Sequence, residues 1–236
     1  MSKIVFVLGA GASAHCGTPL MGNFLEVAED LWRRGEVAEA AVHFKLVFDA
    51  IGHLQGIHSK AKLDTYNIET VYAAFEMGKL LDSLPGIEER RFQEGYGPSI
   101  VIDYLISSIK KVIAYTLERT TKLHHETRGS PSAPESYSRL ADMIKSLISQ
   151  KRDCSIITFN YDLGLDYSLY HHRILPNYGL DDIDVTNKEC VTFLKLHGSL
   201  DWGRCTKCGK IKPYREFQYT ETKPGLDYSI IPIISK

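Results

Sequence analysis

The chain has 236 residues, enough to bury the core of one large domain or of one domain that carries an elaborate insertion. Its 28 Lys and Arg residues nearly cancel 29 Asp and Glu residues, which argues against direct binding of nucleic acid or of an anionic membrane. No segment has the length of a membrane span or the pattern of a signal peptide, and the five cysteines form no disulfide-dense framework. We therefore expect a cytoplasmic protein.

The chain begins with a predicted strand and continues with a long helical block. Residues 3–8 are a continuous β-branched and apolar run, which predicts a central parallel strand buried on both faces. From Phe24 to Gln150 the apolar period becomes helical, apart from an exposed linker over residues 128–136. The apolar residues that share helix faces are Val37, Ala40, Ala41, Phe44 and Phe48; Ile68, Val71, Tyr72 and Phe75; Ile102, Leu105, Ile106, Ile109 and Ile113; and Leu140, Ile144, Leu147 and Ile148.

Strands return after this block. The segments "CSIITF", "VTFLKL" and "YSIIPIIS" are short β-rich runs, although Pro232 moves the last of them toward a sheet edge or a strand start. The pattern predicts an α/β fold: a Rossmann-like parallel sheet with a large helical insertion between its first and second strands. We expect a first strand, loop and helix over residues 1–23, the insertion over 24–150, and the remaining strands over 151–236.

A glycine-rich turn follows the first strand. Residues 9–14, "GAGASA", match the G-x-G-x-x-G/A pattern, in which small residues let a pyrophosphate approach the backbone at the start of a helix. The same residues also suit a tight strand-to-helix connection without a ligand. Glu29 and Asp30 stand at the usual distance for a ribose contact, but they lie in a helical pattern and not at the tip of a second strand.

Polar residues follow two later strands. Asn160 and Asp162 come directly after "IITF", and His197 comes after "FLKL". Ligands of open α/β sheets bind outside the carboxyl ends of the strands, so we expect these residues and the glycine turn to converge on one crevice. The alternative is an Asx turn at Asn160 and Asp162 and a histidine that only caps a loop.

The ordered set "GAGAS", "GTP", "FNYD", "KLHG" and "CTKC" resembles the sirtuin family. Within it, the chain is most similar to the sirtuin-like NAD-consuming domains of bacterial antiphage defence systems. The resemblance implies that Asn160 and Asp162 orient the nicotinamide ribose and a water molecule, and that His197 is the catalytic base. It also implies nucleotide contacts, to NAD as the substrate, from Gly9, Ala10, Gly11, Ser13, Pro19, Asn160, Asp162 and His197.

Two departures separate the chain from sirtuin deacylases. Phe159 stands where they carry a glutamine, and "TPLMGNF" lacks the arginine of their glycine loop. Water is therefore the expected acceptor, and the expected function is that of an NAD+ glycohydrolase that releases nicotinamide and ADP-ribose in antiphage defence. The alternatives are an NAD-dependent protein-lysine deacylase and a non-catalytic module that senses NAD or ADP-ribose.

A C-x-x-C pair lies where sirtuins carry structural zinc. Cys205 and Cys208 have the spacing of a zinc knuckle, but zinc takes four ligands and no second C-x-x-C follows in this sequence. The remaining ligands would lie beyond Lys236 or include Cys190 or a nearby histidine; otherwise the pair binds no metal. A zinc site at Cys205 and Cys208 and a pair without metal are the two interpretations of this motif.

The last expectations concern assembly. A sirtuin-type sheet continues past the zinc region, whereas this sequence ends at "IIPIISK", so we expect an incomplete sheet and an adenosine site completed by further sequence, a partner or another subunit. Apolar residues of the helical block, such as Phe44, Phe48, Tyr72, Phe75 and Ile106, predict a homo-oligomer. A defence-system partner such as an ATPase or an Argonaute-like protein is the other expected partner.

Overall fold

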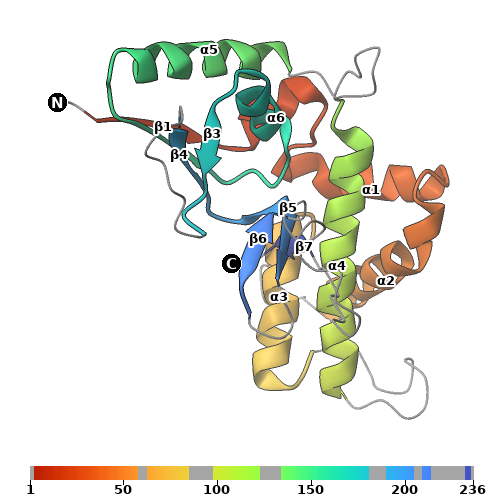
Figure 1. Ribbon diagram of the computed structural model, residues 1–236. Helices are drawn as coiled ribbons and strands as arrows, with labels where there is room; N and C mark the ends of the chain where they lie inside the picture. Colours follow the sequence, from red (N-terminus) through yellow and green to blue (C-terminus); the bar gives the residue numbers. More distant parts are fainter. Residues whose placement is uncertain are drawn as a thin grey trace, which may run out of the picture. The chain divides into compact units, whose positions relative to one another are not determined.

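The computed structural model describes residues 3–57, 63–84, 98–122, 134–180, 190–204, 209–213 and 232–234 (Figure 1). The chain divides into two compact units. The sheet unit contains Met1–Thr18 and Thr120–Lys236, and the helical unit contains Pro19–Arg119. Within the described residues, every helix is too short or too polar to cross a lipid bilayer.

The sheet unit is built on a four-stranded parallel sheet. Its strands are β1 (Ile4–Leu8), β2 (Cys154–Thr158), β3 (Leu175–Asn177) and β4 (Cys190–Lys195), in the spatial order β1-β2-β4-β3. All three strand pairs are parallel. Helices α1 to α5 lie between β1 and β2 in the sequence. The predicted α/β fold with a helical insertion after the first strand is therefore confirmed.

Two amphipathic helices cover one face of this sheet. Helix α5 (Glu135–Ser149) and helix α6 (Gly164–His171) bury their apolar side chains against alternate residues of the strands. The buried cluster consists of Cys16, Tyr137, Ala141, Ile144, Ile156, Leu165, Leu169, Ile174, Val191 and Phe193. Helix α5 thus belongs to the sheet unit, whereas the predicted insertion extended to residue 150.

The predicted central position of the first strand is wrong. Strand β1 pairs only with β2 in the described part of the sheet, so it is an edge strand and β2 and β4 are central. Its odd-numbered side chains face away from the buried cluster: Val5 is 53% exposed and Val7 is 64% exposed. A continuous apolar run does not reveal which strands will flank it, so the run alone could not distinguish an edge strand from a central one.

A second sheet follows the parallel one. Strand β5 (Gly198–Arg204) pairs antiparallel with β6 (Ile211–Pro213) and with β7 (Pro232–Ile234). Pro232 is the first residue of β7, which confirms its predicted place at a strand start. Strand β7, the described part of the segment "YSIIPIIS", pairs with β5 and belongs to this second sheet.

The helical unit contains the predicted amphipathic helices. Its 3-10 turns are η2 (Met21–Asn23) and η3 (Ala38–Ala40), and its helices are α1 (Phe24–Arg33), α2 (Ala41–Ile57), α3 (Ile68–Leu81) and α4 (Pro98–Thr120). The side chains from which we expected a homo-oligomer are not a free surface. Phe44, Tyr72, Phe75 and Ile106 are buried, and the half-buried ring of Phe48 stacks on Trp32.

The chain leaves the sheet unit and returns to it at one place. The amide of Lys122 donates to the carbonyl oxygen of Cys16 at 2.6 Å, and the hydroxyls of Thr18 and Thr121 lie 3.4 Å apart. Gly17 has φ +83°, and a Cβ at this position would lie 2.7 Å from the carbonyl oxygen of Thr120. Only glycine can occupy position 17 without backbone strain and without a clash with Thr120. We call residues 16–18 and 120–122 the neck.

Candidate functional site

The ends of three parallel strands lie side by side. The register aligns Leu8 of β1 with Thr158 of β2, and Thr158 with Lys195 of β4. The next residues extend the alignment: the amide of Phe159 donates to Leu8, and the amide of Leu196 donates to Thr158. The predicted site loops therefore leave the sheet at the same level and on the same edge.

The glycine turn after β1 forms a 3-10 helix, η1 (Ala10–Cys16). The amide of Ala12 donates to the carbonyl oxygen of Gly9, so the amides before it have no acceptor within the helix. Gly9 and Gly11 have no heavy atom within 4 Å of the position that a Cβ would occupy. The backbone does not require glycine at either position, and open space lies beside both.

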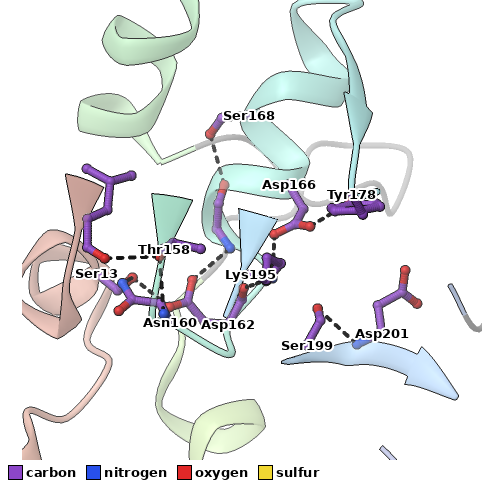
Figure 2. A network of polar contacts seen from close by, with 12 residues as sticks. Ser13, Thr158, Asn160, Asp162, Asp166, Ser168, Tyr178, Lys195, Ser199 and Asp201 are labelled. Atoms are coloured by element: carbon purple, nitrogen blue, oxygen red, sulfur yellow. Dashed lines mark hydrogen bonds and ion pairs between the residues drawn. The ribbon is translucent and has the colours of Figure 1, made fainter. Parts of the chain in front are cut away.

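Ser13 is the centre of a buried polar network (Figure 2). Its side chain, fully buried, donates to Asp162 Oδ2 at 2.6 Å. A hydroxyl has a single hydrogen, so Tyr137, 2.6 Å away, must donate to Ser13. Asn160 Nδ2 donates to the same oxygen at 2.9 Å. All hydrogen-bonding positions of Ser13 are thus used within the protein, and the hydroxyl holds the loops together.

Asp162 closes the network and starts the next helix. Its Oδ1 accepts from the amide of Gly164 at 2.9 Å, which is the local turn that we considered as the alternative for this residue. Its other carboxylate oxygen makes the long-range contact to Ser13. The residue is buried, so both arrangements are present together and the carboxylate faces the protein interior.

Asn160 ties the second loop to the glycine turn. Its side-chain amide donates to the carbonyl oxygen of Gly9 at 2.9 Å as well as to Ser13. Its backbone amide donates to the hydroxyl of Thr158 at 3.1 Å (Figure 2). The side chain is only half-buried, so Asn160 reaches both the buried network and the surface of the site.

His197 lies beside two aromatic rings. Its imidazole meets Phe159 in an edge contact, with ring centroids 5.3 Å apart, and is tilted against Tyr161 at 5.7 Å. The histidine is half-buried and Phe159 is exposed. His197 therefore lies next to the loop that carries Asn160, at a half-buried position.

Tyr137 was missed by the sequence analysis. It lies on α5, is buried, and touches the site through Ser13. Burial, and secondly the nearby charge of Asp162, raise the pKa of its phenol, so the ring stays neutral and keeps its proton as a donor. One tyrosine on the apolar face of a helix looks like an ordinary core residue, and no signal in the sequence could have distinguished it.

The other predicted residues divide between the helical unit and the part of the chain that the structure does not describe. Pro19 is a buried residue of the helical unit. Glu29 and Asp30 pair with Arg33 and Arg34 along α1. Cys205 and Cys208 lie outside the described residues; within the residues that are described, no group of three or more His, Cys, Asp or Glu side chains could hold a metal ion.

No protein-family model matches this chain, and no curated protein matches it.

Proposed function

We propose that the protein is an NAD+ glycohydrolase of the sirtuin-like type that acts in antiphage defence. One observation carries the proposal: Asn160 joins the loop after β2 to the glycine turn after β1, and His197, after β4, lies beside that loop. This is the edge of a parallel sheet at which nucleotides bind. The proposal also relies on the order of the motifs "GAGAS", "FNYD" and "KLHG", which resembles sirtuins.

The glycine turn fits a diphosphate. The open space at Gly9 and Gly11 would let phosphate oxygens approach the backbone, and the first amides of η1 are available as donors. We assign the pyrophosphate of NAD+ to the backbone of residues 9–11. Ser13 and Asp162 hold the loops in place, since both are buried and bonded to each other.

The proposed reaction exchanges one bond for another. The bond between the ribose C1′ carbon and the nicotinamide nitrogen breaks, and nicotinamide leaves with the electron pair. A water oxygen forms the new bond to C1′, and its proton passes to a base. We assign that base to His197, because histidine is the side chain that most often transfers protons in catalysis and this one is half-buried beside the loop of Asn160. Asn160 would orient the ribose through the part of its side chain that faces the site.

The decisive experiment follows nicotinamide and ADP-ribose after NAD+ is added to the purified protein, with and without extracts of phage-infected cells as a source of activator. We expect both products from the wild type and a loss of at least about a hundredfold with His197→Ala. His171→Ala is the matched control, because His171 is an exposed histidine on α6. No product from the wild type, or equal product from His197→Ala, would contradict the proposal.

A second function is favoured by the burial of Asp162. Its carboxylate is bonded to Ser13 and Gly164, so one of the three predicted catalytic side chains is engaged in the protein interior. A non-catalytic module that binds NAD+ or ADP-ribose would have such a site. Calorimetric binding of NAD+ with no turnover, in the presence of the same extracts, would support this function over hydrolysis. Cleavage that occurs only with an acylated peptide would instead indicate a deacylase.

A further inference from the structure

A lysine is buried directly beside the site. Lys195 is the last residue of β4, and its side chain is fully buried. Burial of an ammonium group is unfavourable unless its donors find acceptors. Its Nζ donates to Asp166 Oδ2 at 2.9 Å and to the carbonyl oxygen of Asp162 at 2.7 Å, and lies 5.7 Å from the centre of the Phe193 ring.

The partner carboxylate is itself held in place. Asp166 lies in the first turn of α6, and its Oδ1 accepts from the hydroxyl of Tyr178 at 2.7 Å. The tyrosine ring packs against Phe193 and Trp202. Lys195 therefore joins the end of β4, the start of α6 and the segment after β3 (Figure 2).

The bond from Lys195 to Asp162 fixes the backbone of a loop whose side chains belong to the site. Asp162 is bonded through its carboxylate to Ser13 and through its carbonyl oxygen to Lys195, so the loop is held from both sides. Asn160 lies two residues before Asp162, and His197 lies two residues after Lys195. A single ammonium thus links the two strand ends that carry these residues.

We propose, resting on the NAD+ site assigned above, that Lys195 is a positioning residue: held by Asp166, it sets the loop of residues 159–163 against His197. Its loss should disturb the relative placement of Asn160 and His197 more than the affinity for NAD+. A small misplacement of reacting groups lowers the catalytic rate steeply, whereas the pyrophosphate contacts at the glycine turn would remain.

The test removes both charges, because Lys195→Met alone would leave a buried carboxylate unpaired. In the double variant Lys195→Met with Asp166→Asn, the new amide oxygen still accepts from Tyr178. Lys145→Met is the matched control, since Lys145 donates to the carbonyl oxygen of His172 in the same unit. We expect the double variant to lower kcat at least about tenfold, with the Kd for NAD+ within about threefold, and the control to change neither.

Hydrogen exchange separates this inference from the proposed function, because it needs no NAD+. We expect faster exchange in the double variant for the amides of Gly164 and Leu200, which are bonded to Asp162 and Tyr161. If the wild-type protein does not cleave NAD+ but the double variant exchanges these amides faster, the proposed function is overturned and the positioning role of Lys195 stands. An unchanged kcat and unchanged exchange in a folded variant would overturn the positioning role.

If the double variant does not fold, a more conservative variant tests the positioning role of Lys195. Tyr178→Phe keeps the ring contacts to Phe193 and Trp202 but removes the bond to Asp166. We expect a severalfold fall in kcat and faster exchange at Gly164. No change in either quantity would overturn the proposal.

Discussion

Ser13 and Asp162, which are 149 positions apart in the sequence, share a 2.6 Å hydrogen bond inside the protein. Replacement of Ser13 by Ala would leave Asp162, Tyr137 and Asn160 each without one partner. Buried polar groups without partners are costly, so we expect Ser13→Ala to lower the free energy of unfolding by roughly 2–3 kcal/mol. Urea denaturation measures this loss.

Ser168 is the control for that prediction. It is equally buried, but its hydroxyl donates only to the carbonyl oxygen of Gly164 within its own helix. We expect Ser168→Ala to cost about 1 kcal/mol or less. Equal losses for the two variants would mean that the network around Ser13 contributes no more than one local hydrogen bond.

Gly11 and Gly17 should respond to alanine in opposite ways. At Gly11 a Cβ meets no heavy atom within 4 Å, so we expect Gly11→Ala to change the free energy of unfolding by no more than about 0.5 kcal/mol. If the diphosphate lies against this backbone, the same variant should weaken NAD+ binding at least about tenfold. Calorimetry with NAD+ tests this, and unchanged affinity would remove the phosphate contact from Gly11.

At Gly17 the expected loss is one of stability. Its φ of +83° and the 2.7 Å approach to Thr120 leave no room for a side chain. We expect Gly17→Ala to lower the free energy of unfolding by more than about 1 kcal/mol. Thermal melts of the two glycine variants, measured side by side, check this contrast.

Asn160 and His197 should also differ in their effect on stability. Asn160 makes two side-chain hydrogen bonds to the glycine turn, so we expect Asn160→Ala to cost about 1–2 kcal/mol in addition to any loss of activity. His197 packs against two aromatic rings at a half-buried position, and we expect His197→Ala to cost less. A larger loss for His197→Ala would identify it as a structural histidine.

Cys16 should be inert at neutral pH. Burial, and secondly the charge of Asp162, raise the pKa of its thiol from 9.0 to about 11. The thiolate is therefore scarce at pH 8, and we expect mass spectrometry to find Cys16 unmodified after iodoacetamide treatment of the native protein. The unfolded protein, in which all cysteines react, is the control. Rapid modification in the native state would contradict the burial of this thiol.

The same shift predicts how stability depends on pH. Because the folded state keeps the Cys16 proton to a higher pH than the unfolded state, its contribution is complete below pH 9 and is lost as the pH rises from 9 to about 11. Unfolding measured across this range should therefore show a fall that is reduced in Cys16→Ala. An equal fall in both proteins would assign the effect to other groups.

The sequence predicted the fold from local patterns. Short apolar runs predicted β2 and β4, and apolar residues at helical spacing predicted α2 to α5. The convergence of the glycine turn with Asn160 and Asp162 followed from one rule, that the carboxyl ends of parallel strands share an edge. These features depend on a few neighbouring residues, so a single sequence contains them.

What the sequence could not predict depends on distant neighbours. The edge position of β1 depends on strand order, and the role of Tyr137 depends on a contact with a residue 124 positions away. Lys195 lies in an apolar run, where a lysine usually marks a solvated face, and only the fold brings Asp166 to it. The three hydrogen bonds of the Ser13 hydroxyl likewise come from residues far away in the sequence, so only the fold reveals that the hydroxyl has no position left for a ligand.

The neck has a consequence for the order of folding. Strand β1 pairs with a strand whose first residue is Cys154, so the pairing must close a very long loop. Closing this loop costs conformational entropy, and the chain loses that entropy before the contacts between the strands form. Pairings between distant strands are therefore slow. The contact of Lys122 with Cys16 shortens the open span once the helical unit has folded. In pulse-labelling experiments we therefore expect the amides of the helical unit to gain protection before those of β1.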